Sequence, residues 1–444
     1  MNPPLKMRFL GDEPITSDDK DQLGLNAFAQ LIKTSIYATE TPFVYGILGD
    51  WGTGKTSTMH LLEQAVKLDV TSDRRFVTIW FNAWLYENEA NMIFPLLHAI
   101  KKTYDTLPSA GNESRFRSFF RVASTTALAI SDLALRAVTK KVFDEAISVE
   151  DVKKHMELSE QELNRIEGAL STWVDKVSEL QGSFDNLVDS FAEDYAKAHD
   201  IDKESIILLI IIDDLDRCLP HTTLSILESI KNFLSVKKCV FLLGLNPTVV
   251  YAGIQHKFLG VTVSGREYLE KIINYSFYVP EPDAESVEKF ASLRLADLVD
   301  DRATRDLLSQ RLAAFGNVMS ACGYTNPRKI KRVLNRYLLF LIRYAAKLES
   351  YDIDSIVKLI VQAEYYPDLF QIYLSEGGQV EQLKKIGTKD FNLADFERDT
   401  GVSIAADYAH LARIRKLFEV KNPLQPQVDL VQHAKDVFAI TRLR

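Results

Sequence analysis

The first two thirds of the chain alternate short apolar runs with amphipathic segments, and this pattern predicts an α/β fold. A segment with apolar residues at helical spacing, "DQLGLNAFAQLIKTSIY", precedes the apolar run "FVYGIL" at residues 43–48. The later runs "RFVTIWFNAW", "SIILLIIIDD" and "KCVFLLGLN" are rich in β-branched, aliphatic and aromatic residues, and helical patterns separate them. Because buried parallel strands appear as continuous hydrophobic runs, we expect a three-layer sandwich around a mainly parallel sheet.

A long helical block interrupts this alternation. From about residue 87 the pattern stays helical until the run "SIILLIIIDD", which indicates an insertion between the second and third strands. Such a block needs a packing partner, either an earlier helix of the same insertion in a hairpin or another chain in a dimer or docking arm. Its later half carries an apolar stripe with spacings of three and four, formed by Leu163, Ile166, Leu170, Trp173, Val177, Leu180, Phe184, Leu187 and Phe191.

These patterns divide the chain into five expected parts. The segment "YLEKIINYSFYVPEP" predicts a helix, a short last strand and a proline-rich boundary, beyond which the pattern is helical. We expect the first part of the α/β domain at 1–105, a helical insertion at 106–203, the second part of the α/β domain at 204–282, a helical lid at 283–349 and a C-terminal helical region at 350–444.

Composition narrows the class of protein. With 444 residues, 46% hydrophobic and 26% charged, this is an ordinary globular sequence that can bury more than one core. A net charge of -8 does not indicate nucleic-acid binding through a broadly basic surface, although it leaves room for a local basic face. The three cysteines, Cys218, Cys239 and Cys322, have neither the paired spacing of a zinc site nor the even number of a disulfide framework, which favours a reducing cytoplasm.

No segment predicts export or a membrane span. The N-terminus "MNPPLKMRFLGDEPIT" lacks the cationic start and apolar core of a secretory signal. The best membrane candidate, Phe119 to Val138, contains Arg121, Asp132 and Arg136. These charges leave too short an apolar stretch for a bilayer span, so we interpret the segment as a buried or amphipathic helix.

A glycine-rich loop follows the first predicted strand and precedes a helix. Its sequence, "GDWGTGKT" at residues 49–56, matches the phosphate-binding pattern G-x-x-x-x-G-K-[ST] in the strand–loop–helix context that this pattern requires. Gly52 and Gly54 allow the backbone N–H groups to point inward, and the helix N-terminus adds positive potential. We expect Lys55 to reach the β- and γ-phosphates and Thr56 to bind Mg²⁺. The predicted nucleotide-binding residues are Gly49, Asp50, Trp51, Gly52, Thr53, Gly54, Lys55, Thr56 and Ser57.

A cluster of acidic residues ends the most aliphatic run, "LLIIIDDLDR". Ligands of open α/β sheets bind at the carboxyl ends of the strands, so this is the expected place for catalytic carboxylates. We assign Asp213 to orienting Mg²⁺ and Asp214 to activating water. Asp216 is a candidate helix N-cap, and Arg217 is expected to pair with Asp216 or Asp214 rather than to act as an arginine finger.

Two further residues are candidates for sensing the nucleotide. Asn246 ends the run "FLLGLNP", where it serves either as a polar γ-phosphate sensor or as the cap of the helix that begins at Pro247. In "TNPRKIKRVLN" a helix is predicted to begin at Asn326 and Pro327, with Arg328 in its first turn as an arm that reaches the nucleotide. Lys329, Arg332 and Arg336 share one face of that helix, and a solvated face explains them as well as a functional one does.

Together these motifs resemble those of the KAP family of P-loop NTPases, a branch of the STAND-like ATPases. The resemblance covers roughly residues 10–345. The combination of "FNAW" with "DDLDR" is more specific than the phosphate loop alone. The motifs occur in the expected order: "DQLG", "GDWGTGKTS", "WFNAWLYE", "IIIDDLDRCLP", "YLEKIINYSFYVPEP" and "NPRKIKRVLN".

The resemblance adds expectations that spacing alone does not supply. It implies that Asn82, Trp84 and Glu87 surround the active site, whereas spacing alone predicts a core aromatic at Trp84. Two features depart from the family pattern. A soluble-looking insertion stands where members commonly carry transmembrane helices, and Asn246 stands where the family often has Asp.

By the same resemblance we expect a magnesium-dependent ATPase that acts as a conformational switch. Bacterial members of the family are associated with phage exclusion and other conflict systems, so the resemblance also implies the ATPase component of such a system. ATP is expected over GTP from the family and from the absence of an [NT]-K-x-D guanine motif. No nuclease, protease or transferase pattern accompanies the loop, so the expected partners are a homo-oligomer or a separate effector protein. The alternative is a nucleotide-gated signalling scaffold with negligible turnover, either free or associated with a membrane, for which Asp214 would have no purpose.

Overall fold

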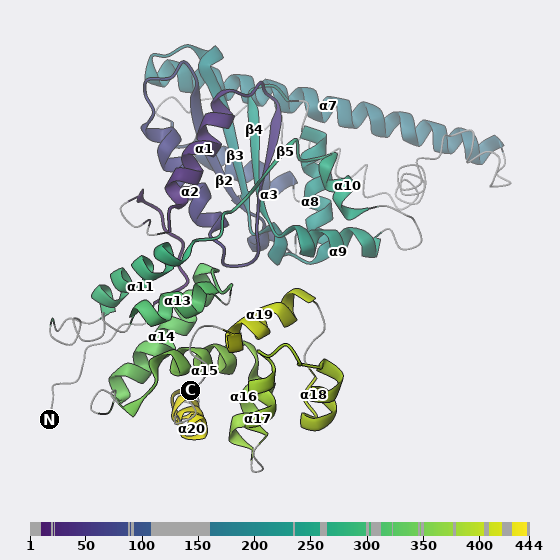
Figure 1. Ribbon diagram of the computed structural model, residues 1–444. Coiled ribbons are helices and arrows are strands. Elements are labelled where there is room, and N and C mark those ends of the chain that lie inside the picture. The colour runs from purple at the N-terminus through teal and green to yellow at the C-terminus, as the bar shows by residue number, and fades with distance from the viewer. Residues whose placement is uncertain are drawn as a thin grey trace. The chain divides into compact units, whose positions relative to one another are not determined.

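The chain forms two structural units, shown in the computed structural model of Figure 1. The α/β unit comprises Asn26–Trp51 and Lys55–Val279, and the helical unit comprises Met1–Leu25, Gly52–Gly54 and Pro280–Arg444. The structure describes residues 10–18, 21, 23–87, 89, 93–107, 160–233, 236–257, 264–298, 302, 312–321, 323–344, 347, 350–375, 379–403, 408–419 and 429–441.

The α/β unit is built on a five-stranded sheet in which every pairing is parallel. The strand order is β2-β3-β4-β1-β5, so the first strand lies between the fourth and the fifth. The predicted parallel α/β fold is therefore confirmed. The strands are β1 (Phe43–Leu48), β2 (Arg75–Asn82), β3 (Ile206–Asp213), β4 (Cys239–Leu245) and β5 (Tyr275–Tyr278).

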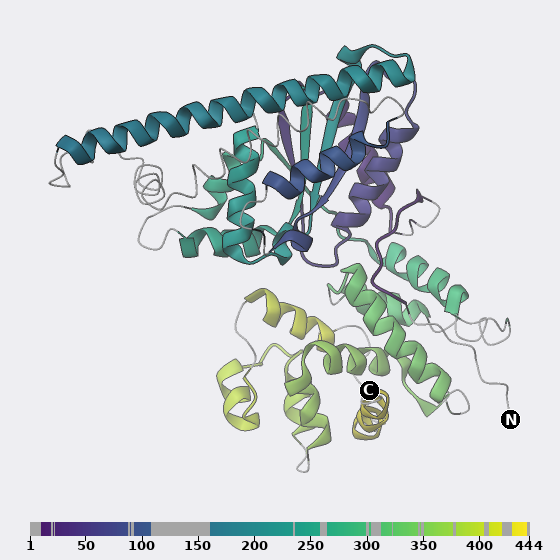
Figure 2. The same cartoon turned by 180° about the vertical axis from the view of Figure 1, so that it is seen from behind.

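Helices cover both faces of this sheet. The chain crosses from β1 to β2 in one direction and returns through β3 and β4, so right-handed connections place the helices of the two crossings on opposite faces. Accordingly α3 lies across the sheet in Figure 2, the view from behind. The helices are α1 (Leu25–Tyr37), α2 (Lys55–Leu68), α3 (Ile93–Tyr104), α7 (Glu160–His199), α8 (Pro220–Phe233), α9 (Pro247–Lys257) and α10 (Gly265–Glu270), with 3-10 turns η2 (Ala83–Tyr86), η3 (Lys203–Ser205) and η4 (Leu215–Arg217).

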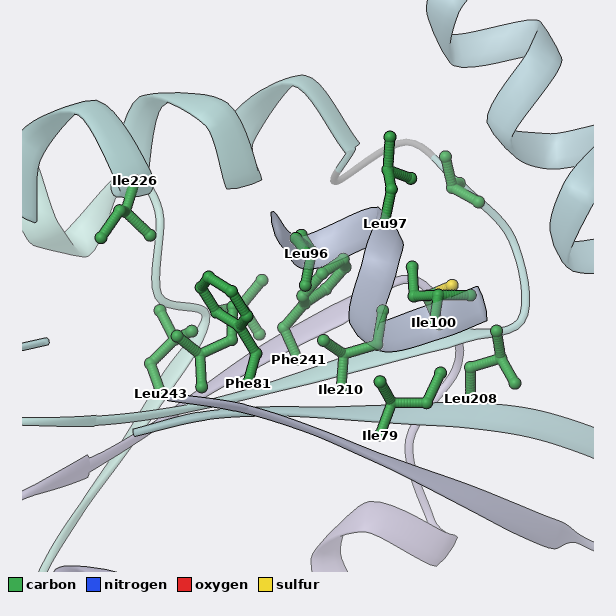
Figure 3. Close-up of a cluster of buried hydrophobic side chains, with 14 of the residues drawn as sticks. Ile79, Phe81, Leu96, Leu97, Ile100, Leu208, Ile210, Ile226, Phe241 and Leu243 are labelled. Atoms are coloured by element: carbon green, nitrogen blue, oxygen red, sulfur yellow. The ribbon is translucent and has the colours of Figure 1, made fainter. Parts of the chain in front are cut away.

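The core of the unit lies between the sheet and the helices α3, α7 and α8 (Figure 3). Every residue of β3 is buried, which is why its sequence is continuously aliphatic instead of alternating. Alternate β3 residues, Leu208 and Ile210 among them, face Leu97 and Ile100 of α3 in one apolar cluster. This packing holds the carboxyl ends of the central strands in fixed positions.

The apolar stripe of the helical block lies on α7, a single helix of 40 residues. Its C-terminal part, with Leu180, Phe184, Leu187 and Phe191, joins the core of the α/β unit, and the ring of Tyr104 in α3 lies 5.6 Å from that of Phe191. The partner of this part of the stripe is therefore the sheet and its helices. The side chains from Leu163 to Val177 in the stripe, and residues 108–159 of the expected insertion, lie outside the described residues.

The helical unit has its own apolar core, in which α14 and α15 contribute many of the buried side chains. Its helices are α11 (Ala284–Leu298), α13 (Leu312–Ala321), α14 (Pro327–Arg343), α15 (Ile353–Tyr365), α16 (Pro367–Leu374), α17 (Val380–Lys385), α18 (Leu393–Thr400), α19 (Tyr408–Glu419) and α20 (Leu430–Thr441).

The structure describes two of the three cysteines but not the membrane candidate. Cys218 and Cys239 are buried free thiols, whereas Cys322 lies outside the described residues. The segment from Phe119 to Val138 is also outside them. Among the helices that the structure describes, none has the length and apolar character needed to cross a bilayer.

Candidate functional site

The candidate site lies where three parallel strands end together. Leu48 of β1 pairs with Leu245 of β4, and the N–H of Gly49 donates to the Leu245 carbonyl at 3.3 Å. On the other side of β4, Ile212 pairs with Leu243, which places Asp213 beside Gly244. The phosphate loop (residues 49–56) and the acidic strand end are therefore brought together by strand register rather than by closeness in sequence.

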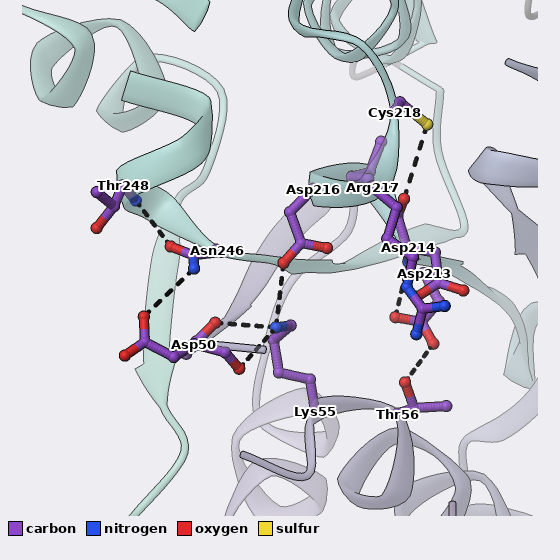
Figure 4. A network of polar contacts seen from close by, with 12 residues as sticks. Asp50, Lys55, Thr56, Asp213, Asp214, Asp216, Arg217, Cys218, Asn246 and Thr248 are labelled. Carbon is purple, nitrogen blue, oxygen red and sulfur yellow. Dashed lines mark hydrogen bonds and ion pairs between the residues drawn. The ribbon is translucent and has the colours of Figure 1, made fainter. Parts of the chain in front are cut away.

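Lys55, the second-last residue of the phosphate loop, is enclosed by the loop (Figure 4). Its Nζ donates to the carbonyl oxygens of Gly49 at 2.9 Å and Asp50 at 3.1 Å, and it lies 3.2 Å from Asp216 Oδ2. The lysine is 8% exposed and Asp216 is 3% exposed. Asp216 lies inside η4, so its sequence-based interpretation as a helix N-cap is wrong, and it serves as the ionic partner of Lys55 instead.

Thr56 and Asp213 form a direct hydrogen bond across the site. The Thr56 hydroxyl donates to Asp213 Oδ2 at 2.6 Å, and the N–H of Asp214 donates to Asp213 Oδ1 at 2.8 Å. Burial raises the pKa of the Asp213 carboxyl above its ordinary value, and the hydrogen bond from Thr56 opposes that rise. The pair thus presents two hard oxygen atoms, the ligand type that Mg²⁺ prefers, so the residues present fit a magnesium ion.

Gly244 makes room for this pair. A Cβ atom at this position of β4 would lie 2.8 Å from Asp213 Oδ1 and 2.7 Å from Met59 Cε on α2. Both distances are shorter than real contacts allow. A glycine inside a strand often marks such a close approach, and the isolated glycine of "FLLGLNP" was a signal for this position in the sequence.

Asp214 follows Asp213 in the left-handed backbone region, with φ 59° and ψ 26°. Its carboxylate is engaged by two other side chains: Asn82 Nδ2 donates to Oδ2 at 2.9 Å, and Arg217 Nε lies 2.7 Å from Oδ1. Of the two partners considered for Arg217, the structure therefore selects Asp214.

Of the two alternatives for Asn246, the structure shows the helix cap, whereas γ-phosphate sensing stays a prediction. Its Oδ1 accepts the N–H of Thr248 at 3.0 Å at the start of α9. Its Nδ2 donates to Asp50 Oδ1 in the phosphate loop at 3.3 Å. One buried amide thus connects the end of β4, the loop and the first turn of α9 (Figure 4).

The three residues implied by the family resemblance surround Asp214 and the turn after it. Asn82 bonds to Asp214, and Glu87 Oε1 accepts the N–H of Leu219 at 2.6 Å. Trp84 is 47% exposed, and the Arg217 guanidinium lies 5.3 Å from the centre of its ring. The core position that spacing alone predicts for Trp84 is therefore wrong.

The remaining candidates lie in the loop and on α14. Gly52 and Gly54 have φ angles of 84° and 106°, backbone conformations that favour glycine, and Trp51 is 53% exposed. Arg328 lies in the first turn of α14, after the cap Asn326, as predicted. Within the helical unit its Nε is 3.2 Å from Asp12 Oδ2.

The sequence profile described as the KAP family P-loop domain matches residues 24–342. The "Phage T7 exclusion protein" of Escherichia coli (strain K12) is 23% identical over 343 residues. The match covers 74% of this chain but only 43% of that relative.

Two solved structures show a distant likeness. The Aeropyrum pernix ORC2 protein, in ADPNP–ADP complexes, is 11% identical with a TM-score of 0.40, over 98% of this chain and 99% of that chain. The Aeropyrum pernix ORC1 protein in complex with DNA is 10% identical with a TM-score of 0.33, over 91% and 83% of the two chains.

Proposed function

The chain belongs to the KAP family of P-loop proteins, and from this premise we propose that it is a magnesium-dependent ATPase that acts as a conformational switch. The observation that carries the proposal is the 2.6 Å hydrogen bond between Thr56 and Asp213. It brings the last residue of the phosphate loop to the acidic end of a buried strand, beside the enclosed Lys55.

Each side chain then has a role that its position supports. The loop residues Gly49 to Ser57 bind the phosphates, with Lys55 as the positive charge at the β- and γ-phosphates. Thr56 and Asp213 hold Mg²⁺, which when bound neutralises charge on the phosphates. Asp214 is the base that activates water.

The switch needs a path from the nucleotide to the rest of the protein. Asn246 offers one, because its amide joins Asp50 of the loop to the first turn of α9. We assign Asn246 as the γ-phosphate sensor and Arg328 as the residue that the helical lid, 283–349, contributes to the nucleotide. In this scheme residues 350–444, which share an apolar core with α14, receive the signal.

The proposed biological role is supported by the relative named for phage exclusion. Because the chain matches less than half of a protein named for phage exclusion, we propose that it is the ATPase component of a bacterial anti-phage defence or conflict system. The output then comes from a homo-oligomer or from a separate effector protein that recognises the ATP state.

Steady-state phosphate release with Mg-ATP and Mg-GTP, together with direct nucleotide binding, tests the proposal. Lys55→Ala should lower turnover by about 100-fold or more because it removes the positive charge at the phosphates. Asp214→Asn should lower turnover by about 100-fold while binding survives, because only the proton acceptor is lost. Lys67→Ala is the matched control, since Lys67 lies on the same helix but is exposed and paired with Glu63.

Tight ATP binding without phosphate release above the Lys55→Ala background, even with candidate partners added, would contradict the ATPase. It would leave a nucleotide-gated scaffold as the function. Preference for Mg-GTP would contradict the assignment of ATP.

A further inference from the structure

The end of β2 lies beside the end of β3, and this places an amide against the proposed water-activating base. The two strands pair in register from Arg75 opposite Ile206 to Asn82 opposite Asp213. Asn82 therefore lies opposite the residue that directly precedes Asp214. Its Nδ2 donates to Asp214 Oδ2 at 2.9 Å.

The orientation of the Asn82 amide is fixed from its other end. Its Oδ1 accepts the N–H groups of Trp84 at 3.0 Å and Leu85 at 3.4 Å, and so caps the 3-10 turn η2. A flipped amide would turn its NH₂ group toward two N–H donors and its oxygen toward a carboxylate. The hydrogen-bond network therefore allows one orientation, and that orientation aims the donor at Asp214.

Asp214 needs such an external restraint. An aspartate side chain has two torsions, and the second is broad, so the backbone alone does not fix where the carboxylate oxygens point. Asp214 also leaves the strand in the left-handed region. Its N–H donates to Asp213 Oδ1 and its carbonyl accepts the N–H of Arg217, and neither backbone contact fixes the carboxylate. Its other carboxylate partner, Arg217, is 39% exposed and lies on a three-residue turn.

We propose that Asn82 is a positioning residue for the reaction: its amide, anchored by the cap of η2, fixes the carboxylate of Asp214 in the geometry that activates water. The proposal rests on the ATPase function proposed above. Asn82 does not contact the nucleotide in this scheme and acts through Asp214. The rate of the chemical step depends strongly on such placement, because a proton acceptor must lie within hydrogen-bonding distance of the water it activates.

Asn82→Asp separates the two roles of the side chain. The variant keeps an acceptor oxygen for Trp84 and Leu85, but it replaces the donor with an oxygen that faces the carboxylate of Asp214. We expect kcat for phosphate release to fall by about 10-fold or more, with KM and the Kd for Mg-ATP changed by less than about 3-fold. Asn82→Ala should lower kcat to a similar extent and should also lower the unfolding temperature, because it removes the cap as well.

A double-mutant cycle with Asp214→Asn shows whether Asn82 acts through Asp214. In that background there is no base to position, so substitution of Asn82 should change the residual turnover by less than about 2-fold. The same loss of kcat in both backgrounds, or wild-type kcat in Asn82→Asp, would overturn the inference while the ATPase function stands. A wild type that releases no phosphate would instead refute the ATPase function, and the positioning role with it.

Discussion

The molecule contains two charged regions of opposite design, the strand-end site of the α/β unit and the basic face of α14 in the helical unit. At the strand ends, Lys55, Asp213 and Asp216 are each less than a tenth exposed. Lys55 pairs with Asp216 and donates to the loop carbonyl of Gly49, and Asp213 accepts a hydrogen bond from Thr56. Along α14 the basic side chains have separate partners. Lys329 lies over the rings of Tyr324 and Tyr365, and Arg336 pairs with Glu364 at 2.5 Å.

The difference indicates which of the two charged regions contributes to the stability of the fold. Desolvating several charges together is unfavourable, and apolar residues of similar size would hold a sheet at least as well. We therefore interpret this cluster as a functional site, and the raised pKa of Asp213 is of the kind that concentrates at such sites. The α14 pairs, by contrast, join neighbouring elements of one core. Lys329 and Arg336 thus contact neighbouring side chains of the helical unit, whereas Arg332, the third basic residue of this face, is exposed, as the solvated interpretation predicts.

The strongest way to sharpen this comparison is Asp213→Asn. Turnover of ATP should fall by about 100-fold or more, because the carboxylate proposed to hold Mg²⁺ is lost. The shape of the side chain is kept, so the unfolding free energy should not fall. A variant that retains wild-type phosphate release would contradict the role of Asp213.

The same variant has a predicted pH signature. The folded-state pKa of Asp213 is raised, so the folded protein binds the proton more tightly than the unfolded chain does. The wild type therefore loses stability as pH rises from the ordinary carboxyl value of 3.8 through the raised one. Asp213→Asn should be more stable than the wild type at neutral pH, and this gain should vanish below pH 3.8 in urea unfolding at a series of pH values.

A smaller effect is expected at Gly244. Gly244→Ala places a methyl group against Asp213 Oδ1 and Met59 Cε, so we expect a loss of about 1–3 kcal/mol in unfolding free energy and a lower turnover. Gly182→Ala is the matched control, because a Cβ at that position of α7 meets nothing within 4 Å. It should add about 0.5–1 kcal/mol through helix propensity. Equal effects of the two alanines in denaturant unfolding would refute the close packing at Gly244.

The smallest effect is expected on α14. Arg336→Ala removes the partner of Glu364, whose side chain is 12% exposed, and should lower the unfolding free energy by about 1–2 kcal/mol without changing phosphate release. Arg398→Ala, which breaks pairs of a side chain that is 70% exposed, serves as the control and should be close to neutral. A large loss of turnover in Arg336→Ala would break the distinction between the two regions.

The fold was predictable where the signal is local. "FVYGIL" and "KCVFLLGLN" became β1 and β4 because continuous apolar runs are buried on both faces of a parallel sheet. Asn326 and Pro327 begin α14 because a cap and a fixed φ angle suit the first turn. The packing of α7 on the sheet was not predictable, since an apolar stripe states that a helix needs a partner without naming it.

The same limit separates the parts of the site. The phosphate loop and the acidic strand end are contiguous motifs, so their chemistry is visible in the sequence. The bonds from Asn82 to Asp214 and from Lys55 to Asp216 depend on strand order and register, which link residues 132 and 161 positions apart. Only a tertiary structure shows such contacts.

The register of β2 on β3 also makes the position of Asn82 depend on the length of β2. Eight residues of β2 pair with eight of β3, so the number of residues from Arg75 determines that Asn82 lies opposite Asp213. Substitutions within the strand that stay apolar keep this count, but an insertion or deletion of a single residue turns every later side chain to the opposite face of the sheet. We therefore expect the length of this strand to tolerate change less than its apolar composition does, because Asn82 must stay opposite Asp213 to reach Asp214.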